Sequence, residues 1–179
     1  MNAQNVLTKQ HIKETARRLM TADDLEDELL LAKHKQLVDL GSTAHPVFAE
    51  LLEETADPVG VSRLLGMFVE GQGDKRIAKE AIRKLLARPR PSDPRMEIIT
   101  LVLPALAKVG DSKDATSIVH LLDDPEKNVR LAAIRALGEI GGRDVLLKLD
   151  AKKDDKAIKD DTRTQTAIEE ARRKIQNRL

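Results

Sequence analysis

The sequence contains no cysteine, no tryptophan and no tyrosine, and only two of its 179 residues are aromatic, Phe48 and Phe68. The lack of cysteine excludes disulfides, thiolate metal sites and a cysteine nucleophile. The lack of large aromatic residues means that any core must be filled by Leu, Ile, Val and Ala. These residues suit closely packed helices, and the sequence has few runs of alternating strand-forming residues, so we expect an all-α fold without a sheet.

Long apolar runs and a targeting segment are also missing from the sequence. Residues 1–5 lack the basic start and apolar stretch that are typical of a secretory signal. The most apolar segment, 98–107, is interrupted by Thr100 and Pro104. A membrane helix needs about 20 apolar residues. We therefore expect a cytoplasmic protein with no membrane partner.

The formal net charge of +1 conceals an uneven distribution of charge along the chain. Residues 21–60 carry ten acids against two lysines, whereas residues 71–109 carry nine bases against four acids. The sequence therefore predicts one acidic and one basic region. Solvated helix faces are the simplest interpretation of such runs, because charged residues are mostly exposed.

Recurring residues indicate where helices begin and end. Aspartate before proline favours a helix start, because aspartate caps the first amides and proline needs no amide hydrogen bond at the first helical position. Glycine after an apolar stretch favours a helix end in the left-handed conformation. The aspartates are Asp57, Asp93 and Asp124, and the glycines are Gly71, Gly110 and Gly141.

Two segments share one apolar pattern at an offset of 31 residues, from position 98 to position 129. Both follow the i, i+3, i+4, i+7 spacing of one helix face. A period near this length, with one helix pair in each unit, is typical of a solenoid. The first copy is Ile98, Leu101, Val102, Ala105, Leu106 and Val109, and the second is Val129, Ala132, Ala133, Ala136, Leu137 and Ile140.

The periodicity predicts two first helices followed by four helix pairs. The first helices are 3–20 and 24–40, of which the second is expected to bury Leu29, Leu30, Leu37 and Leu40. The predicted pairs are 44–55 with 57–71, 74–88 with 94–109, 112–123 with 126–140, and 143–150 with 160–178. Residues 1–43 would then form an N-terminal cap or extension, and residues 44–179 a repeat array closed by a polar capping helix.

Residues 94–150 resemble HEAT repeats of the phycobilisome-lyase type, through the segments 105–111 and 121–141. The resemblance is weaker over 44–90 and absent over 1–43. It implies an α-solenoid of about four HEAT-like helix pairs, in the manner of an armadillo-type superhelix. It also implies hydrogen bonds between repeats from a turn aspartate and an arginine six positions later, which Asp124 and Arg130 match. The preceding repeat has Ile99 in place of the arginine.

The resemblance implies a protein-binding face on the second helix of each pair, since these helices line the concave surface of HEAT arrays. On helix 126–140, Lys127, Leu131 and Arg135 lie opposite the apolar stripe, and the offset of 31 residues places Met96 and Thr100 beside them. We expect an exposed Leu and Met flanked by basic residues to contact a partner protein. The alternative is that Leu131 is an isolated exposed apolar residue.

A basic stripe is the second candidate site. Arginine and lysine side chains on helix 74–88 and in the proline-rich segment after it could meet phosphate or an acidic protein surface. The lack of Tyr and Trp weakens single-strand recognition, which relies on aromatic stacking. The stripe consists of Arg76, Lys79, Arg83, Arg90 and Arg95.

The sequence offers no pattern for catalysis or metal binding. None of the four histidines lies at a metal-ligand spacing from another histidine or a carboxylate; they are His11, His34, His45 and His120. We therefore expect a non-enzymatic scaffold that binds a protein, without metal, cofactor or small-molecule ligand. The alternatives are a nucleic-acid-binding solenoid and, through the family name alone, a subunit of a tetrapyrrole lyase.

Overall fold

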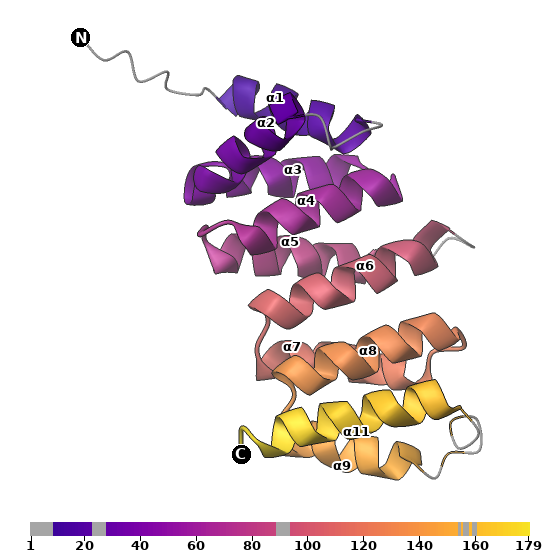
Figure 1. Cartoon of the computed structure of the whole chain (residues 1–179). Helices are drawn as coiled ribbons and strands as arrows, with labels where there is room; N and C mark the ends of the chain where they lie inside the picture. Colours follow the sequence, from indigo (N-terminus) through magenta and orange to yellow (C-terminus); the bar gives the residue numbers. More distant parts are fainter. Residues whose placement is uncertain (1–8, 23–27, 89–93, 154, 156–157, 159–160) are drawn as a thin grey trace. The chain divides into compact units, whose positions relative to one another are not determined.

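The computed structural model describes residues 9–22, 28–88, 94–153, 155, 158 and 161–179. The regular secondary structure in these ranges is helical, and they contain no strand, which confirms the all-α prediction. The chain divides into two compact units, Met1–Arg90 and Pro91–Leu179 (Figure 1). No helix of the described residues is long and apolar enough to cross a membrane.

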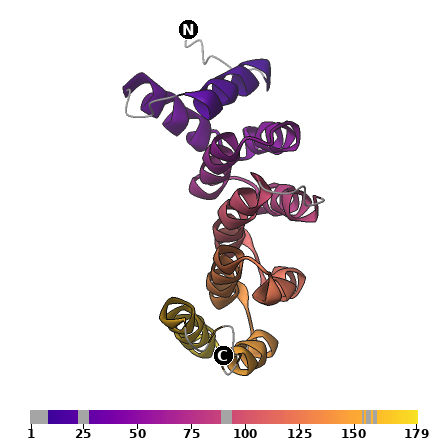
Figure 2. The ribbon, with the colours of Figure 1, turned by 90° about the vertical axis from the view of Figure 1, so that its right-hand side faces the viewer.

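The first unit consists of two layers of helices. Helices α1, α3 and α5 form one layer, and α2 and α4 form the other (Figure 2). Most boundaries lie within a few residues of those predicted, although the N-terminal part of predicted helix 3–20 and residues 23–27 lie outside the described residues. The elements are α1 (Lys9–Thr21), α2 (Glu28–Asp39), η1 (Gly41–Thr43), α3 (His45–Glu54), α4 (Pro58–Glu70) and α5 (Lys75–Ala87).

Three rings form the centre of the first unit. The centroid of the Phe68 ring lies 5.5 Å from that of Phe48 and 4.9 Å from that of His45, both in edge-on geometry. His45 is 1% exposed, and its Nδ1 lies 3.2 Å from the Asp74 carbonyl oxygen. A Cβ atom added at Gly73 would overlap the His45 ring. The sequence analysis did not identify His45 as a core residue.

The exposed surface of α2 differs from the prediction. Leu37 is buried as expected, but Leu29 is 61% exposed, and Leu30 and Leu40 are only partly buried. The predicted buried set on this helix is therefore wrong except for Leu37. The leucines of α2 have the spacing of one apolar helix face, but the helices that pack against α2, which are α1 and α4, cover only part of this face.

The predicted aspartate caps have different outcomes. The Asp57 carboxylate accepts a hydrogen bond from the Gly60 amide at 2.7 Å, and α4 begins at Pro58 as predicted. Helix α8 begins only at Lys127, so the prediction that Asp124 caps it is wrong. The Asp124 carboxylate instead accepts from the Glu126 amide at 3.0 Å and shapes the turn before the helix. Asp93 lies outside the described residues.

The predicted left-handed helix ends are also wrong. Gly71 and Gly141 end their helices in extended conformation, with φ of −73° and −74°, and Gly41 is the one glycine of the described residues that has positive φ. Glycine is required at position 141 for space. A Cβ there would lie 2.5 Å from the Leu137 carbonyl oxygen, the acceptor of the Gly141 amide.

Arginines from later parts of the chain bind the open carbonyls at helix ends. Arg63 Nη1 donates to the Leu19 carbonyl at 2.8 Å, near the end of α1. Arg88 Nη1 donates to the Thr55 carbonyl at 3.0 Å, after α3. In the second unit, Arg178 Nη2 donates to the Gly138 carbonyl at 2.8 Å. The last carbonyls of a helix lack partners within the helix and carry partial negative charge. A guanidinium donates the missing hydrogen bonds and also compensates this charge.

The second unit also consists of two layers. Helices α6, α8 and α11 lie side by side in one layer, and α7 and α9 form the other (Figures 1 and 2). Helix α7 continues into η2, so the predicted helix 112–123 is divided between two helix types. The elements are α6 (Pro94–Val109), α7 (Ser112–Ile118), η2 (Val119–Asp123), α8 (Lys127–Ile140), α9 (Arg143–Lys153) and α11 (Thr162–Gln176).

Helix α8 is enclosed on several sides, because it contacts α6, α7, η2 and α11. Leu131, which we expected on the surface, is 3% exposed, so that prediction is wrong. The predicted apolar stripe accounts for only part of what α8 buries. Ala132 of the stripe is only partly buried, whereas Leu131 and Ile134 outside it are buried, because α6 and α11 cover the flanks of the helix. The close approach of α11 is visible at Gly138, where an added Cβ would lie 2.8 Å from Ala171 Cα.

Gly138 and Gly66 form a matched test of this contact. Alanine is the better helix former by about 1 kcal/mol. At position 66 on α4 an added Cβ would meet only the end of the Glu70 side chain, at 3.9 Å. Gly66→Ala should therefore raise the free energy of unfolding by about 0.5–1 kcal/mol. Gly138→Ala must displace α11 backbone, so it should lower that free energy by about 1 kcal/mol in spite of its propensity gain. Urea denaturation measures both, and stabilisation by Gly138→Ala would contradict the contact.

The buried His45 predicts that stability falls in mild acid. Burial lowers the pKa of His45 below its ordinary value of 6.5, although the Asp74 carbonyl opposes this shift. The unfolded chain therefore takes up a proton near pH 6.5 while the folded chain resists it. The free energy of unfolding should decrease as the pH falls below about 6.5, until the pH reaches the pKa of His45 in the folded protein.

The matched control for this pH effect is His45→Asn, whose side-chain amide can still donate to the Asp74 carbonyl but does not titrate. Urea denaturation of both proteins between pH 7.5 and 5.5, conditions chosen to span the ordinary histidine pKa of about 6.5, separates His45 from the other histidines. The wild-type protein should lose stability more steeply than the variant. Equal slopes would show that His45 is not the group responsible.

Candidate partner-binding groove

Helices α6, α8 and α11 enclose a groove of about 930 Å³ in the second unit. Every lining residue belongs to one of these three helices, which lie side by side in one layer (Figure 2). We call it the α8 groove, because α8 runs along its middle. Its lining residues are Thr100, Pro104, Ala107, Lys108, Asn128, Leu131, Ala132, Arg135, Ala136, Glu139, Arg163, Glu170 and Lys174.

The floor of the α8 groove is made of small apolar side chains. Ala107 and Ala132 are partly exposed, whereas Leu131 and Ala136 are buried at its base. Pro104 is exposed at the edge on α6, whose helix continues through it from Pro94 to Val109. Proline has no amide hydrogen and alanine has a short side chain, so this floor offers a partner apolar contact and few hydrogen-bond donors.

The rim of the α8 groove carries more positive than negative charge. Lys174 and Glu139 neutralise each other through an ion pair at 2.5 Å. The basic side chains of Lys108, Arg135 and Arg163 are exposed, and none of them forms an ion pair with another described residue; Glu170 is the remaining acid. The uncompensated rim charge is therefore three positive against one negative.

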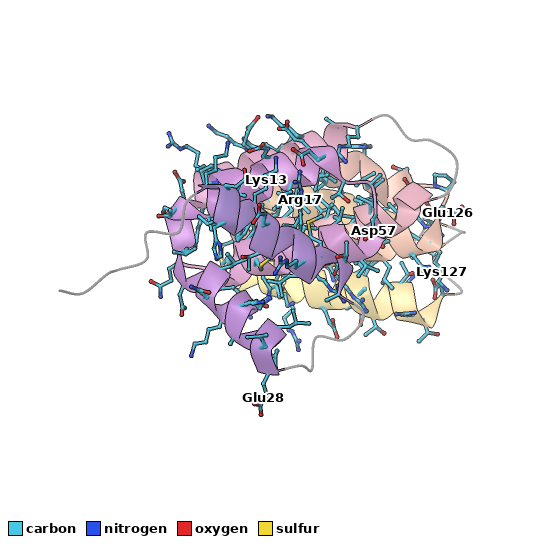
Figure 3. The ribbon with its side chains drawn as sticks, turned by 90° about the horizontal axis from the view of Figure 1, so that it is seen from above. Lys13, Arg17, Glu28, Asp57, Glu126 and Lys127 are labelled. Atoms are coloured by element: carbon cyan, nitrogen blue, oxygen red, sulfur yellow. The ribbon has the colours of Figure 1, made fainter. Side chains whose placement is uncertain are left out.

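The predicted protein-binding residues are only partly brought together. Thr100, Leu131 and Arg135 line the α8 groove, although Leu131 contributes from its base and not from an exposed ridge. Lys127 lies outside the lining and pairs with Asp161 at 3.0 Å. Figure 3 labels it beside Glu126, where α8 begins. The side chain of Met96 lies outside the described residues.

The basic stripe is compensated where the structure describes it. The exposed Arg76 side chain pairs with the Asp74 carboxylate at 3.2 Å. Lys79 is partly buried, Arg83 is exposed, and both have interactions of their own. Arg90 and the side chain of Arg95 lie outside the described residues. The described part of the stripe on α5 is therefore less available to a phosphate than the sequence suggested.

The acidic region of the sequence is also partly neutralised within the first unit. Lys13 on α1 binds Glu50 at 2.5 Å and Glu54 at 2.7 Å on α3, and Arg17 binds Glu54 at 2.8 Å. Figure 3 shows Lys13 and Arg17 about one turn apart on α1. The hydrogen bond from Lys13, aided by one from Lys9, lowers the pKa of Glu50 to about 2. These acids therefore stabilise the packing of α1 on α3 and do not form a free acidic surface.

The α11 contribution to the groove was missed by the sequence analysis. Arg163, Glu170 and Lys174 all belong to α11. Glu170 and Lys174 lie more than 25 residues after the end of α8 in the sequence. Their position follows from the buried α11 residues Ile168 and Ala171, which place this helix against α8. The buried face of a helix, taken alone, does not indicate which neighbouring helix covers it.

The described residues contain no group of three or more His, Asp or Glu side chains placed to hold a metal ion. The groups that line the α8 groove are amines, guanidiniums, two carboxylates, the Thr100 hydroxyl, the Asn128 amide and small apolar side chains. This set suits the binding of a charged, partly apolar surface.

Comparison with known proteins adds no family to this description. No family model matches the chain, and no curated protein and no solved structure matches it either.

Proposed function

We infer that this protein is a non-enzymatic binding module, and that a segment of a partner protein docks in the α8 groove. The observation that carries the proposal is the groove itself: about 930 Å³ bounded by three helices, with an apolar floor and a charged rim. Protein-binding surfaces combine these features, with apolar contacts at the centre and polar residues around them.

A HEAT-like solenoid is the architecture that we propose for this module. Two observations support it: alternating helices that form two layers within each unit, and the 31-residue offset between α6 and α8. In the turn before α8, Arg130 Nη1 donates to the carbonyls of Asp124 and Pro125, both at 2.8 Å; these bonds lie within one turn, whereas the resemblance implied bonds between repeats. In such an array the layer of α6, α8 and α11 would provide the binding surface.

Nucleic-acid binding through the basic stripe is the rival proposal, and it has less support. Nucleic-acid binding requires cations that are free to neutralise phosphates and so displace counterions from the nucleic acid. Arg76 already pairs with Asp74, and Lys84 on the same helix pairs with Glu53 at 2.7 Å. The α8 groove retains exposed cations without such partners, so it is the better candidate.

Site-specific photo-crosslinking in extracts of the native host tests the proposal. A photoreactive residue in place of Glu170, at the rim of the groove, should yield a defined protein adduct. The same residue in place of Leu147, which is exposed on α9 outside the groove lining, is the matched control and should not yield it. A third substitution, at Arg83 on α5, reports on the basic stripe.

The outcomes distinguish the two sites. An adduct that forms from position 170 and disappears with Ala132→Met, which fills the groove floor with a longer side chain, supports docking in the groove. Circular dichroism confirms that the Ala132→Met protein is folded. Crosslinking to nucleic acid from position 83, without a protein adduct from position 170, would overturn the proposal in favour of the stripe.

A further inference from the structure

The cations on the three groove helices differ in whether they form ion pairs. Lys127 on α8 and Arg172 on α11 pair with Asp161 and Asp150, so their charge is satisfied within the unit. The three exposed cations of the rim have no ion-pair partner among the described residues, and each comes from a different helix: Lys108 from α6, Arg135 from α8 and Arg163 from α11.

This arrangement places positive charge on all three walls of one groove. Charges of one sign that line a concave surface reinforce one another and attract ligands of the opposite sign. The single uncompensated acid, Glu170, reduces this field without reversing it. An occupant with several carboxylates would meet a guanidinium or an ammonium group from each helix, and charge-assisted hydrogen bonds to carboxylates are among the stronger ones.

The floor of the groove adds a second requirement. Ala107, Ala132 and Ala136 project little from their helices, and Leu131 lies 3% exposed at the base. An entirely polar occupant would cover this floor without any gain from apolar contact. An occupant with apolar side chains facing the floor would remove both surfaces from water, at about 25 cal/mol per Å² buried.

The chemistry of the lining favours a segment of polypeptide over a nucleic acid, because the floor is apolar. None of the lining residues is aromatic, so the groove lacks the aromatic side chains on which nucleic-acid bases usually stack.

We propose that the occupant of the α8 groove is an acidic amphipathic segment of a partner protein. Its apolar side chains contact the alanine floor, and its carboxylates bind Lys108, Arg135 and Arg163. This proposal rests on the proposed function, because it names the class of partner for the same groove.

Fluorescence anisotropy with synthetic peptides tests the partner class on the full-length chain. The main probe is a fluorescein-labelled amphipathic helix of about 15 residues, comparable in length to the groove helices, with leucine on one face and glutamate on its flanks. Three comparison peptides replace every glutamate by glutamine, every glutamate by lysine, or every leucine by serine. The acidic amphipathic peptide should bind at least about tenfold more tightly than each of them.

Charge reversal locates the binding site. Arg135→Glu with Arg163→Glu should weaken binding of the acidic peptide by about tenfold or more, since two rim attractions become repulsions. The matched control is Arg143→Glu with Lys148→Glu. Both residues are exposed on α9 in the same unit, lie outside the groove lining, and change the net charge by the same amount. The control should bind as the wild-type protein does, and circular dichroism should show both variants folded.

The remaining outcomes separate this inference from the proposed function. If the glutamine or lysine peptide binds best and Ala132→Met abolishes that binding, the groove docks protein but the acidic class is wrong. If the serine peptide binds as well as the leucine peptide, charge alone explains binding and the inference fails. If no peptide binds and position 170 yields no protein adduct, both proposals fail together.

Discussion

The position of α8 between α6 and α11 is the constraint on which the second unit depends. A helix covered on its flanks as well as on its inner face needs small residues where its neighbours approach. Gly138 faces Ala171 for this reason, and the short side chains of Ala132 and Ala136 leave the surface between the three helices recessed. The same requirement that lets the helices pack closely therefore leaves the shallow apolar floor of the α8 groove.

Helix positions could largely be predicted from the sequence, because apolar periodicity is a local signal that the final fold retains. The start of α4 could also be predicted from a local signal, because the Asp-Pro pair indicates both the position of the first helical residue and the hydrogen bond that the Asp57 carboxylate accepts. The conformation at helix ends could not be predicted in this way. Asp124 shapes the turn before α8 and does not cap the helix itself. Gly141 has an extended backbone, and glycine is needed there because a Cβ atom would lack space, not because φ is left-handed.

The candidate site could be predicted only in part, since it depends on which helices become neighbours. Arg135 was identified because it lies opposite the apolar stripe of α8, and Thr100 because the 31-residue offset relates α6 to α8. Leu131 was assigned to the surface because a single amphipathic stripe implies one buried face, whereas α8 has several. Arg163 was missed because the packing of α11 on α8 leaves no local signal in the sequence around Arg163 itself.

The arginines that bind helix ends have a consequence for how the protein opens. Arg63 ties the end of α1 to α4, and Arg88 ties the end of α3 to the segment after α5, so the spans 19–63 and 52–88 overlap. Arg178 closes a separate span, 138–178, in the second unit. Segments joined by shared contacts exchange their amide hydrogens as one cooperative group. We therefore expect residues 19–88 to open as one such group and residues 138–178 as another.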